Sequence, residues 1–391
     1  MRVLHVITRL IVGGAQENTI SSVLGLRQKP GLSVKLITGR TNKAEGSLEP
    51  PLSAVPDLLE IIPELVRPIH LRNDIITLRK LTGVFRAERP HIVHTHSSKA
   101  GVLGRVAAAR ANVPIIIHTI HGPAFGSFQG PLANILFRAA EKYAARVTTH
   151  FVVVAEAMKQ QYLAAGIGTP EQYTTVLSGF DLTAFLNAKN DMDFRARFGF
   201  GADDIVIGKI SRLFKLKGHK DLFEIAANLM ERSSKIKFLL VGGGEWQSRF
   251  EQQVRKQGLS KHFVFTGIVP PSEVPRFVGI MDILVHLSSR EGLPRALPQA
   301  MAAAKPVVAY DCDGAREVCL DRQTGFLIKP GALDLLTDRL LQLANDVQLR
   351  DRFGKAGQKF VRERFDVSLM VDRLYDLYLQ LARRTPNLFF S

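Results

Sequence analysis

Glu291 and Gln299 are the two side chains whose types and spacing best suit a polar ligand. We expect Glu291 in a polar loop, residues 288–294, that follows an apolar strand and precedes a small-residue helix carrying Gln299. Such a loop offers unbonded backbone N–H groups and the positive end of the helix dipole, which suit an anionic or hydroxyl-rich ligand. A carboxylate and an amide two helical turns apart can hold two parts of one ligand. The alternative is a surface carboxylate and an ordinary helix glutamine.

Arg212 and Lys217 are two cations in another predicted strand-to-helix connection. The planar guanidinium and the compact ammonium can converge on a diphosphate, although surface charge is the alternative in so basic a chain. The turn of three glycines at residues 242–244 also follows a strand, and glycines let a nucleotide approach the backbone closely. This turn is not the G-x-G-x-x-G pattern with an acidic partner, so we infer no NAD site.

Glycines and histidines mark the ends of predicted strands in the first half of the chain. Gly13 and Gly14 follow the first strand, where glycine lets a ligand crowd the backbone, although tight strand-to-helix turns use the same pair. His94 and His96 end one strand, and His121 follows the next. A His-x-His pair can be half of a metal site, but nothing in the sequence fixes further ligands. We therefore favour a histidine that forms a hydrogen bond beside a polar cleft.

Two Asp-x-Asp pairs have a spacing that can hold Mg²⁺ or Mn²⁺ through a diphosphate. Asp311 and Asp313 follow a predicted strand, whereas Asp191 and Asp193 lie in a polar linker and are expected to be solvated. We predict no metal site from either pair.

Strands alternate with helices along the whole chain, which predicts an α/β fold of doubly wound parallel sheets. The pattern stops in the polar segment 187–204 and then starts again, so we predict two Rossmann-like domains. They are placed at residues 1–183 and 184–366, followed by a final helix and tail, 367–391, that can pack back on the first domain. Ligands bind beyond the carboxyl ends of such strands, so a cleft between the sheets is the expected site. The predicted strands are 3–7, 34–38, 92–94, 115–119, 151–154, 205–211, 237–241, 262–266, 283–287, 307–309 and 326–328.

Composition limits the class of protein. A hydrophobic content of 46% in 391 residues excludes a largely disordered chain. Cys312 and Cys319 form no C-x-x-C motif, which indicates a reducing compartment. His5 and Arg9 interrupt the first apolar run, so we interpret it as a buried strand and not as a signal peptide. No apolar run is long enough to predict a membrane span, and the expected location is the cytoplasm.

The net charge of +16 predicts attraction to polyanions such as nucleic acid, anionic lipid or phosphate-bearing substrates. Residues 74–89 have the pattern of an amphipathic helix with a basic face, which is either a solvated surface or a contact with an anionic membrane surface. No nucleic-acid recognition motif or row of stacking aromatic residues accompanies the charge, so we expect no nucleic-acid partner.

The ordered series of motifs resembles the retaining glycosyltransferases of family 4, which use nucleotide-sugar donors and have the GT-B fold of two Rossmann-like domains facing a central cleft. The resemblance covers nearly the whole chain and has the character of bacterial polysaccharide and lipid-linked-glycan transferases. The stretch 286–310 is similar to the family's E-x7-E signature. The other matching motifs are GGAQE from Gly13, HTHSSKAG from His94, HTIHGPAF from His118, SGFDLTAF from Ser178, GKISRLFKLKGH from Gly208 and LVGGGE from Leu240.

The resemblance implies a role for each matching residue. Arg212 and Lys217 match the basic pair that binds the donor diphosphate, and Glu291 matches the glutamate that holds donor-sugar hydroxyls. Gln299 departs from the pattern, because the family has a second glutamate there that binds the ribose hydroxyls. We therefore expect weaker nucleotide binding, not an inactive site. The other positions assigned to the donor are His121 near the transferred sugar, Gly13 and Gly14 near the phosphate, Gly243 near the nucleotide, and the backbone amides of Gly292, Leu293 and Pro294, which assist Glu291.

The resemblance also implies the reaction. A hexosyltransferase of this kind moves a sugar, most often from a UDP-sugar, to a glycan or lipid-linked acceptor in cell-surface polysaccharide synthesis. The first domain would bind the acceptor and the second the nucleotide-sugar. The sugar would be transferred with retention by front-face attack, without a metal ion or a cofactor, by a protein at the inner face of the plasma membrane. The alternatives are a non-catalytic sugar-nucleotide-binding protein and a sugar-nucleotide epimerase with the same fold.

Overall fold

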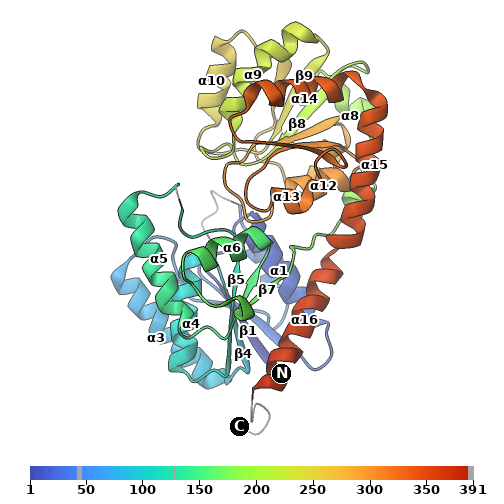
Figure 1. Ribbon diagram of the computed structural model, residues 1–391. Coiled ribbons are helices and arrows are strands. Elements are labelled where there is room, and N and C mark those ends of the chain that lie inside the picture. The colour runs from blue at the N-terminus through green and yellow to red at the C-terminus, as the bar shows by residue number, and fades with distance from the viewer. Residues whose placement is uncertain (42–45, 127, 386–391) are drawn as a thin grey trace. The chain divides into compact units, whose positions relative to one another are not determined.

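The computed structural model describes residues 1–41, 46–126 and 128–385, and the chain divides into two compact units (Figure 1). The first unit consists of Met1–Phe180 and Val367–Ser391, and the second of Asp181–Asp366. The first division thus falls at Phe180, where residue 183 was expected. Its physical reason is helix α7 (Thr183–Leu186), which packs against α11 (Val274–Gly279) and α12 (Ala296–Ala302) of the second unit.

The first unit is built on a seven-stranded sheet in which the strand pairs are parallel, in the order β3-β2-β1-β4-β5-β6-β7. Two strands of this sheet, β3 and β7, were not predicted, because each has only three residues and too little alternation to recognise. The strands are β1 (Arg2–Ile7), β2 (Ser33–Thr38), β3 (Leu59–Ile61), β4 (Ile92–His96), β5 (Ile115–Ile120), β6 (His150–Val153) and β7 (Tyr173–Thr175).

Helices cover both faces of this sheet, so its central strands are buried on both sides. Val3 and Ile7 of β1 point into a core shared with α1 and α16, whereas Leu4 and Val6 point into a core shared with α3 and α4. The helices are α1 (Gly14–Arg27), α2 (Glu49–Ser53), α3 (Leu71–Glu88), α4 (Ser98–Arg110), α5 (Pro131–Ala145), α6 (Glu156–Ala164) and α16 (Val367–Arg384).

Helix α16 follows the second unit in sequence but packs against α1 of the first. The contact is close at Gly25, where an added Cβ atom would lie 2.4 Å from a methyl group of Val371. Met370, Leu374 and Tyr378 complete the apolar side of α16 in the same core.

The second unit has a six-stranded parallel sheet in the order β10-β9-β8-β11-β12-β13, and all six strands were predicted. Together the two sheets confirm the predicted α/β class with two Rossmann-like, doubly wound parts. The strands are β8 (Ile205–Ile210), β9 (Ile236–Val241), β10 (Phe263–Phe265), β11 (Ile283–His286), β12 (Val307–Tyr310) and β13 (Gly325–Ile328). The remaining helices are α8 (Met192–Arg197), α9 (His219–Arg232), α10 (Gln247–Lys256), α13 (Ala315–Val318), α14 (Leu333–Asn345) and α15 (Val347–Arg364).

Three features expected from the sequence can be compared with these elements. Among the helices of the described residues, none is long and apolar enough to cross a bilayer. The predicted amphipathic helix is α3, which buries Leu81 and Phe85 and leaves Arg72 and Arg79 exposed. Both thiols, Cys312 and Cys319, are free.

Candidate active site

Lys217 and Glu291 form the centre of the candidate site in the second unit. Lys217 lies in the connection from β8 to α9, and Glu291 in the connection from β11 to α12, so both follow the carboxyl ends of neighbouring strands. The Lys217 Nζ atom donates a hydrogen bond to Glu291 Oε1 over 2.5 Å. The two side chains are 20% and 19% exposed, so the ion pair is largely sheltered from water but still reachable. The structure therefore brings together two residues that the sequence predicted separately.

The backbone holds these two connections against each other. The carbonyl of Leu216 accepts hydrogen bonds from the Ser289 N–H group at 3.0 Å and from the Ser288 hydroxyl at 3.2 Å. Gly218 has a φ of 67°, and an added Cβ atom there would lie 2.0 Å from the carbonyl oxygen of Leu287. Only glycine fits so close a contact in this left-handed conformation. The residue next to Lys217 thus allows the loop to reach the end of β11.

His286, the last residue of β11, is a third member of the site, with its Nε2 atom 3.4 Å from Glu291 Oε1. Burial raises the pKa of the Glu291 carboxyl, but the Lys217 ammonium and His286 outweigh it and hold that pKa below its ordinary value. Burial lowers the pKa of His286, although Glu291 opposes the change. Glu291 is therefore an ionised acceptor at neutral pH. The sequence analysis assigned His286 no role. Its position at the end of a predicted strand, five residues before Glu291, could have indicated one.

Lys209 of β8 is a buried cation that sequence reasoning also missed. Its side chain is 1% exposed, and its Nζ atom has no hydrogen-bond partner among the described residues. Burial lowers the pKa of Lys209 to about 7; Lys217 adds to this effect, and Glu291 and Asp221 oppose it. An isolated buried ammonium is costly for a fold. Its position near Lys217 and Glu291 therefore indicates that it serves the site. A lysine within an otherwise apolar strand could have indicated a functional role from the sequence alone.

Arg212 and the glycine turn lie at the same edge of the sheet. Arg212 is exposed in the β8–α9 connection that also carries Lys217. The next residue, Leu213, donates its N–H group to the carbonyl of Gly243 over 2.9 Å. The turn after β9 is thus bonded to the connection that carries both predicted cations. Arg212, Lys217, Gly243 and Glu291 all follow the carboxyl ends of adjacent strands, where parallel sheets bind ligands.

The loop after Glu291 departs in two ways from the expected geometry. Helix α12 begins only at Ala296, so Gln299 lies in its first turn and not two helical turns beyond Glu291. Pro294 has no N–H group, which leaves Gly292 and Leu293 as the backbone donors of this loop. The predicted separation of two helical turns was therefore wrong, because residues 291–295 are not helical. The predicted donor at Pro294 was wrong because proline has no N–H group. Gln299 is partly buried.

Protein groups bind three aspartates of the Asp-x-Asp pairs: Asp191, Asp311 and Asp313. Asp313 accepts a hydrogen bond from the N–H group of Glu291 at 2.7 Å, and Asp311 is paired with Arg316 at 2.5 Å. Asp191 was expected to be solvated, but it caps α8 by accepting from the N–H group of Phe194 at 2.9 Å, and it also pairs with Arg276. These side chains fix loops and a helix end, and Asp313 holds the loop that carries Glu291.

In the first unit, His121 follows β5 and is the end of a row of hydrogen-bonded histidines. Its Nε2 atom lies 3.0 Å from Nδ1 of His96, and Nε2 of His96 lies 2.9 Å from Nδ1 of His5. The row crosses from β5 to β4 to β1, which are neighbours in the sheet. Burial lowers the pKa of His121 and of His5 to about 3, and it lowers the pKa of His96 well below its ordinary value. All three imidazoles are therefore neutral.

The row continues from His5 through helix α16. Tyr378 places its hydroxyl 3.2 Å from Nε2 of His5 and 2.5 Å from Nδ1 of His94, and Nε2 of His94 lies 2.6 Å from the Thr119 hydroxyl. A neutral imidazole donates through one nitrogen and accepts through the other. From His121 through His96 to His5 the bonds must therefore run in the same direction, whereas the Tyr378 hydroxyl can accept from both His5 and His94. In one direction His121 presents Nδ1 as an acceptor, and in the other as an N–H donor.

The same histidines answer the question of a metal site raised by the His-x-His pair. His5 joins His94 and His96, and ligand atoms of the three residues lie within 4.8 Å of one another. However, both ring nitrogens of each of these histidines already have partners in the row. The arrangement suits a hydrogen-bonded relay, and the sequence could not reveal it because it depends on strand register and on α16.

Gly13 and Gly14 lie where β1 gives way to α1. Gly13 has a φ of 176°, which is extended backbone that any residue adopts, and Gly14 is exposed as the first residue of the helix. Both are at the carboxyl edge of the sheet of the first unit, as is His121. Neither residue needs to be glycine for its backbone conformation. The idea that their lack of a side chain lets a ligand approach the backbone therefore stays a prediction.

Comparisons with known proteins cover both units. The family model "Glycosyl transferase 4-like domain" matches residues 13–179, and "Glycosyl transferases group 1" matches residues 191–360. An Escherichia coli UDP-Gal:alpha-D-GlcNAc-diphosphoundecaprenol alpha-1,3-galactosyltransferase is 28% identical over 82% of this chain and 83% of its own. The Staphylococcus aureus capsular polysaccharide biosynthesis glycosyltransferase CapM is 25% identical over 82% of this chain and 85% of its own.

Solved structures show the same fold over nearly the whole chain. The structure of Anabaena Alr3699/HepE in complex with UDP-glucose has a TM-score of 0.83 at 23% identity and covers 97% of this chain and 100% of its own. The sucrose-phosphate synthase of Thermosynechococcus elongatus has a TM-score of 0.82 at 20% identity and covers 98% of this chain and 100% of its own.

Proposed function

Because the chain belongs to the family 4 glycosyltransferases and has their GT-B fold, we propose that it transfers a sugar from a UDP-sugar to a glycan or lipid-linked acceptor in cell-surface polysaccharide synthesis. We assign the nucleotide-sugar to the second unit and the acceptor to the first. The E. coli relative, whose name includes a UDP-sugar and a diphosphoundecaprenol acceptor, supports this choice of substrates. The proposed location is the cytoplasmic face of the membrane that holds such an acceptor.

The observation that supports the proposal most is the Lys217–Glu291 pair at the carboxyl edge of the second sheet. The ammonium and the carboxylate are adjacent, so a donor bound there would meet a cation at its diphosphate and an acceptor atom at its sugar hydroxyls. Lys209 is buried near both residues and adds positive charge in its protonated form. A site with this order of charges suits a sugar attached to a diphosphate.

The residues of the second unit would act on the departing group. As the bond between the anomeric carbon and the diphosphate oxygen breaks, negative charge grows on the diphosphate, and Arg212 and Lys217 would stabilise it. The acceptor oxygen forms its new bond to the same face of the anomeric carbon, and its proton passes to the departing diphosphate oxygen. Glu291 would hold the sugar hydroxyls, with the N–H groups of Gly292 and Leu293 as neighbouring donors. The stereochemical outcome is retention.

Metal independence is part of the proposal. The family resemblance gives the charge-neutralising role to Arg212 and Lys217, and the Asp-x-Asp carboxylates that were the alternative already bind protein groups. No cofactor is needed for a reaction whose co-substrate is the nucleotide-sugar. His121, with its neutral imidazole, is proposed as a hydrogen-bond partner of the transferred sugar.

A two-step experiment tests the proposal. Thermal unfolding with a panel of nucleotide sugars identifies the donor, because a ligand at 100 times its Kd stabilises a fold by about 2.7 kcal/mol. The donor is then incubated with lipid-linked and soluble glycans, and the product is analysed by NMR for its anomeric configuration, with and without EDTA. Transfer with retention that EDTA leaves unchanged is expected. Donor binding without transfer to any acceptor would indicate a binding protein, and epimerisation of the donor alone would indicate an epimerase.

A further inference from the structure

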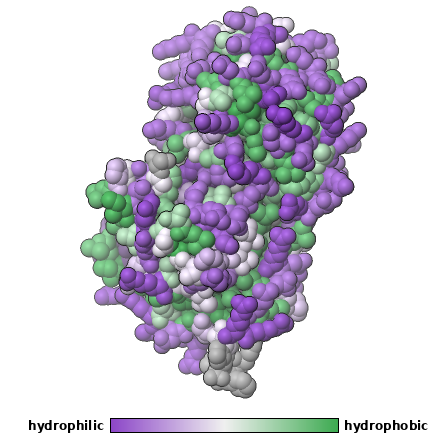
Figure 2. All heavy atoms as spheres, in the orientation of Figure 1, coloured by the Kyte–Doolittle hydropathy of each residue, from purple (hydrophilic) through white to green (hydrophobic). Residues whose placement is uncertain are grey.

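Helix α5 of the first unit turns an apolar face toward solvent. Four large side chains of this helix are more than half exposed, and they are spaced at i, i+3, i+4 and i+11, so they lie on one face. We call this face the apolar stripe. It consists of Leu132 (82% exposed), Ile135 (67%), Leu136 (54%) and Tyr143 (57%). Figure 2 shows the corresponding apolar surface at the left edge of the molecule, over α5.

A buried ion pair fixes the rotation of α5 that exposes the stripe. Glu141, on the opposite face of the helix, is 1% exposed and accepts a hydrogen bond from Arg105 of α4 over 2.7 Å. Arg105 also donates to the carbonyl of Gly101 and to the hydroxyl of Thr148, so it is held from several sides. The helix cannot turn its apolar stripe inward without leaving these two charges unpaired, which is costly. The buried ion pair thus keeps the stripe exposed in the folded protein.

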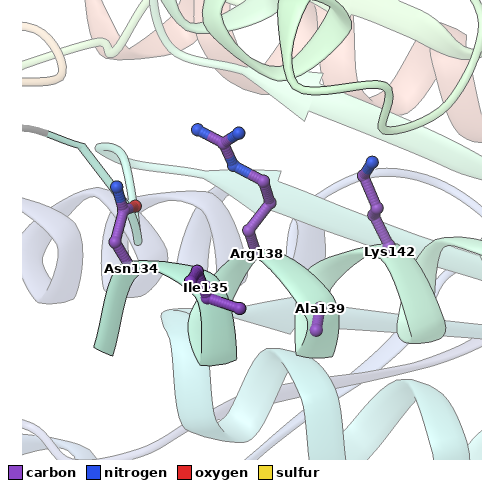
Figure 3. A pocket seen from close by; sticks show the side chains of 5 residues that line it. All are labelled: Asn134, Ile135, Arg138, Ala139 and Lys142. Carbon is purple, nitrogen blue, oxygen red and sulfur yellow. The ribbon is translucent and has the colours of Figure 1, made fainter. Parts of the chain in front are cut away.

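Only positive charge accompanies the stripe at the surface. Arg138, Lys142 and Arg146 are exposed at intervals of four residues along α5 and just beyond its end. Figure 3 shows Arg138 and Lys142 pointing the same way from the helix, beside a shallow hollow also lined by Asn134, Ile135 and Ala139. Between Glu88 and Glu156 the sequence contains one acidic residue, Glu141, and the structure buries it. The segment from Arg89 to Ala155 therefore presents no exposed carboxylate of its own to oppose the binding of anions.

We propose that α5 docks this protein on an anionic membrane surface. The apolar stripe would enter the boundary between headgroups and acyl chains, while Arg138, Lys142 and Arg146 would contact lipid phosphates. An exposed apolar face beside a basic face, on a helix too polar and too short to span, is the pattern of an interfacial helix. The basic side chains explain why the occupant is a bilayer and not a second copy of this chain. A symmetric dimer over the stripe would bring two identical rows of cations together.

The neighbouring basic helix α3 is less suited to this role. Its apolar residues Leu81 and Phe85 face the core, Leu71 and Ile75 near its start are exposed, and Lys80 is paired with Glu64 at 2.8 Å. The sequence had suggested this helix because basic residues alternate there with apolar ones. The structure shows that α3 buries Leu81 and Phe85 and exposes apolar residues near its start, whereas the large apolar residues of α5 are exposed along most of the helix.

Membrane docking can be measured without sugar transfer, so it stands or falls separately from the proposed function. The full chain is sedimented with vesicles of phosphatidylcholine alone or of equal parts phosphatidylcholine and phosphatidylglycerol. We expect binding to the anionic vesicles that weakens with added salt. Replacing Arg138 and Lys142 by glutamine should weaken it about 30-fold, since each basic residue near such a surface contributes about 1 kcal/mol. Ile135→Asn with Leu136→Asn should weaken it at least about tenfold.

A matched control removes two charges from α3 by Arg72→Gln and Arg79→Gln, and it should retain most of the binding. The replaced side chains of α5 are exposed, so each variant should unfold at the temperature of the wild type. A direct probe of insertion is Leu132→Trp in a Trp246→Phe background, whose fluorescence should shift to the blue on anionic vesicles only. Wild-type binding by the α5 variants would overturn the proposal. So would absence of vesicle binding together with a dimer that Ile135→Asn dissociates.

Discussion

Lys217 and Glu291 are 74 residues apart in sequence, and their side chains meet at 2.5 Å. The contact depends on the backbone bonds between Leu216 and residues 288–289, and on the glycine at position 218 that lets the loop approach β11. These backbone contacts therefore keep the ammonium of Lys217 next to the carboxylate of Glu291. In the proposed reaction the ammonium meets the diphosphate and the carboxylate meets the sugar, so the pair must be available to both parts of the donor.

The ionisation of Glu291 predicts how the stability of the second unit changes with pH. Its pKa lies below the ordinary value of 4.5, so ionised Glu291 contributes stability that is fully present above pH 4.5 and is lost as the pH falls. Glu291→Gln removes this contribution and leaves Lys217 without its counter-charge. We expect the variant to be less stable than the wild type at neutral pH, by a difference that shrinks below about pH 4.5.

Urea unfolding at a series of pH values measures this difference. Glu273→Gln, at an exposed glutamate of the same unit, is the control and should match the wild type. A difference between wild type and Glu291→Gln that stays constant down to about pH 3 would show that the ion pair contributes no stability.

We predict that the buried Lys209 lowers the stability of the fold but strengthens UDP binding. Burial of its charged form destabilises the fold in full below pH 7, and the cost disappears as the pH rises from about 7 toward 10.5. Lys209→Met should therefore raise the melting temperature at neutral pH, and this gain should shrink toward pH 10.5. It should also weaken UDP binding several-fold, because a positive charge near the proposed diphosphate site is lost.

Lys305 supplies the matched control for this change. It is another lysine of the second unit whose pKa burial lowers, but its Nζ atom donates to the carbonyl of Gly279 over 2.8 Å. Lys305→Met should lower the melting temperature and leave UDP affinity as it was. A destabilised Lys209→Met variant with normal UDP affinity would mean that Lys209 has a structural role only.

Gln299 predicts a gain of affinity on restoring a carboxylate. A hydrogen bond from a ribose hydroxyl to a charged acceptor contributes about 1.5–3 kcal/mol, and one to a neutral amide about half of that. Gln299→Glu should lower the donor KM with nearly constant kcat, measured by initial rates. Gln299→Met, which keeps the length of the side chain, should raise KM. An unchanged or higher KM in Gln299→Glu would contradict the assignment of Gln299 to the ribose.

The histidine row predicts a long-range effect of helix α16 on His121. Tyr378→Phe removes the hydroxyl that joins His5 to His94 and leaves one nitrogen of each without that partner, at a cost of about 1–3 kcal/mol each. Because the bonds that join His5, His96 and His121 share one direction, the loss of the hydroxyl at His5 should also change the tautomer of His121. Nitrogen-15 NMR of the histidine rings measures the tautomer directly.

His118 is an internal control in the same spectrum. It lies on the other face of the sheet, bonded to Thr95 and not to the row. Its nitrogen shifts should stay constant in Tyr378→Phe while those of His121 and His96 change. Unchanged shifts at His121 would mean that the row does not transmit its direction.

The sequence predicted those features that local pattern determines. Alternating strands and helices gave the two doubly wound sheets, and family motifs, which the family models confirm, drew attention to Lys217 and Glu291. The three-residue strands β3 and β7 were missed because they are too short to show a period. Gln299 was misplaced because a proline and three other non-helical residues separate Glu291 from α12.

Features that depend on contacts across the fold could not be predicted. The histidine row needs the register that sets His5 beside His94, together with Tyr378 from a helix near the other end of the chain. The exposed stripe of α5 has the sequence of a buried face, and only the Glu141–Arg105 pair reveals which side is turned inward. Lys209 stood inside an apolar strand, but its environment near Lys217 and Glu291 is a property of the folded sheet.

The central claim is that Lys217 and Glu291 act together on one nucleotide-sugar donor, and a double-mutant cycle in the transfer assay tests it most directly. Lys217→Ala and Glu291→Ala should each lower kcat/KM at least about 100-fold, a loss typical of a removed transition-state donor. The double variant should be little worse than either single one, because residues that act as a unit are not additive. Lys215→Ala, at an exposed lysine of the same loop, should be near normal. Near-normal kcat/KM in either single variant, or losses that simply multiply in the double variant, would contradict the account.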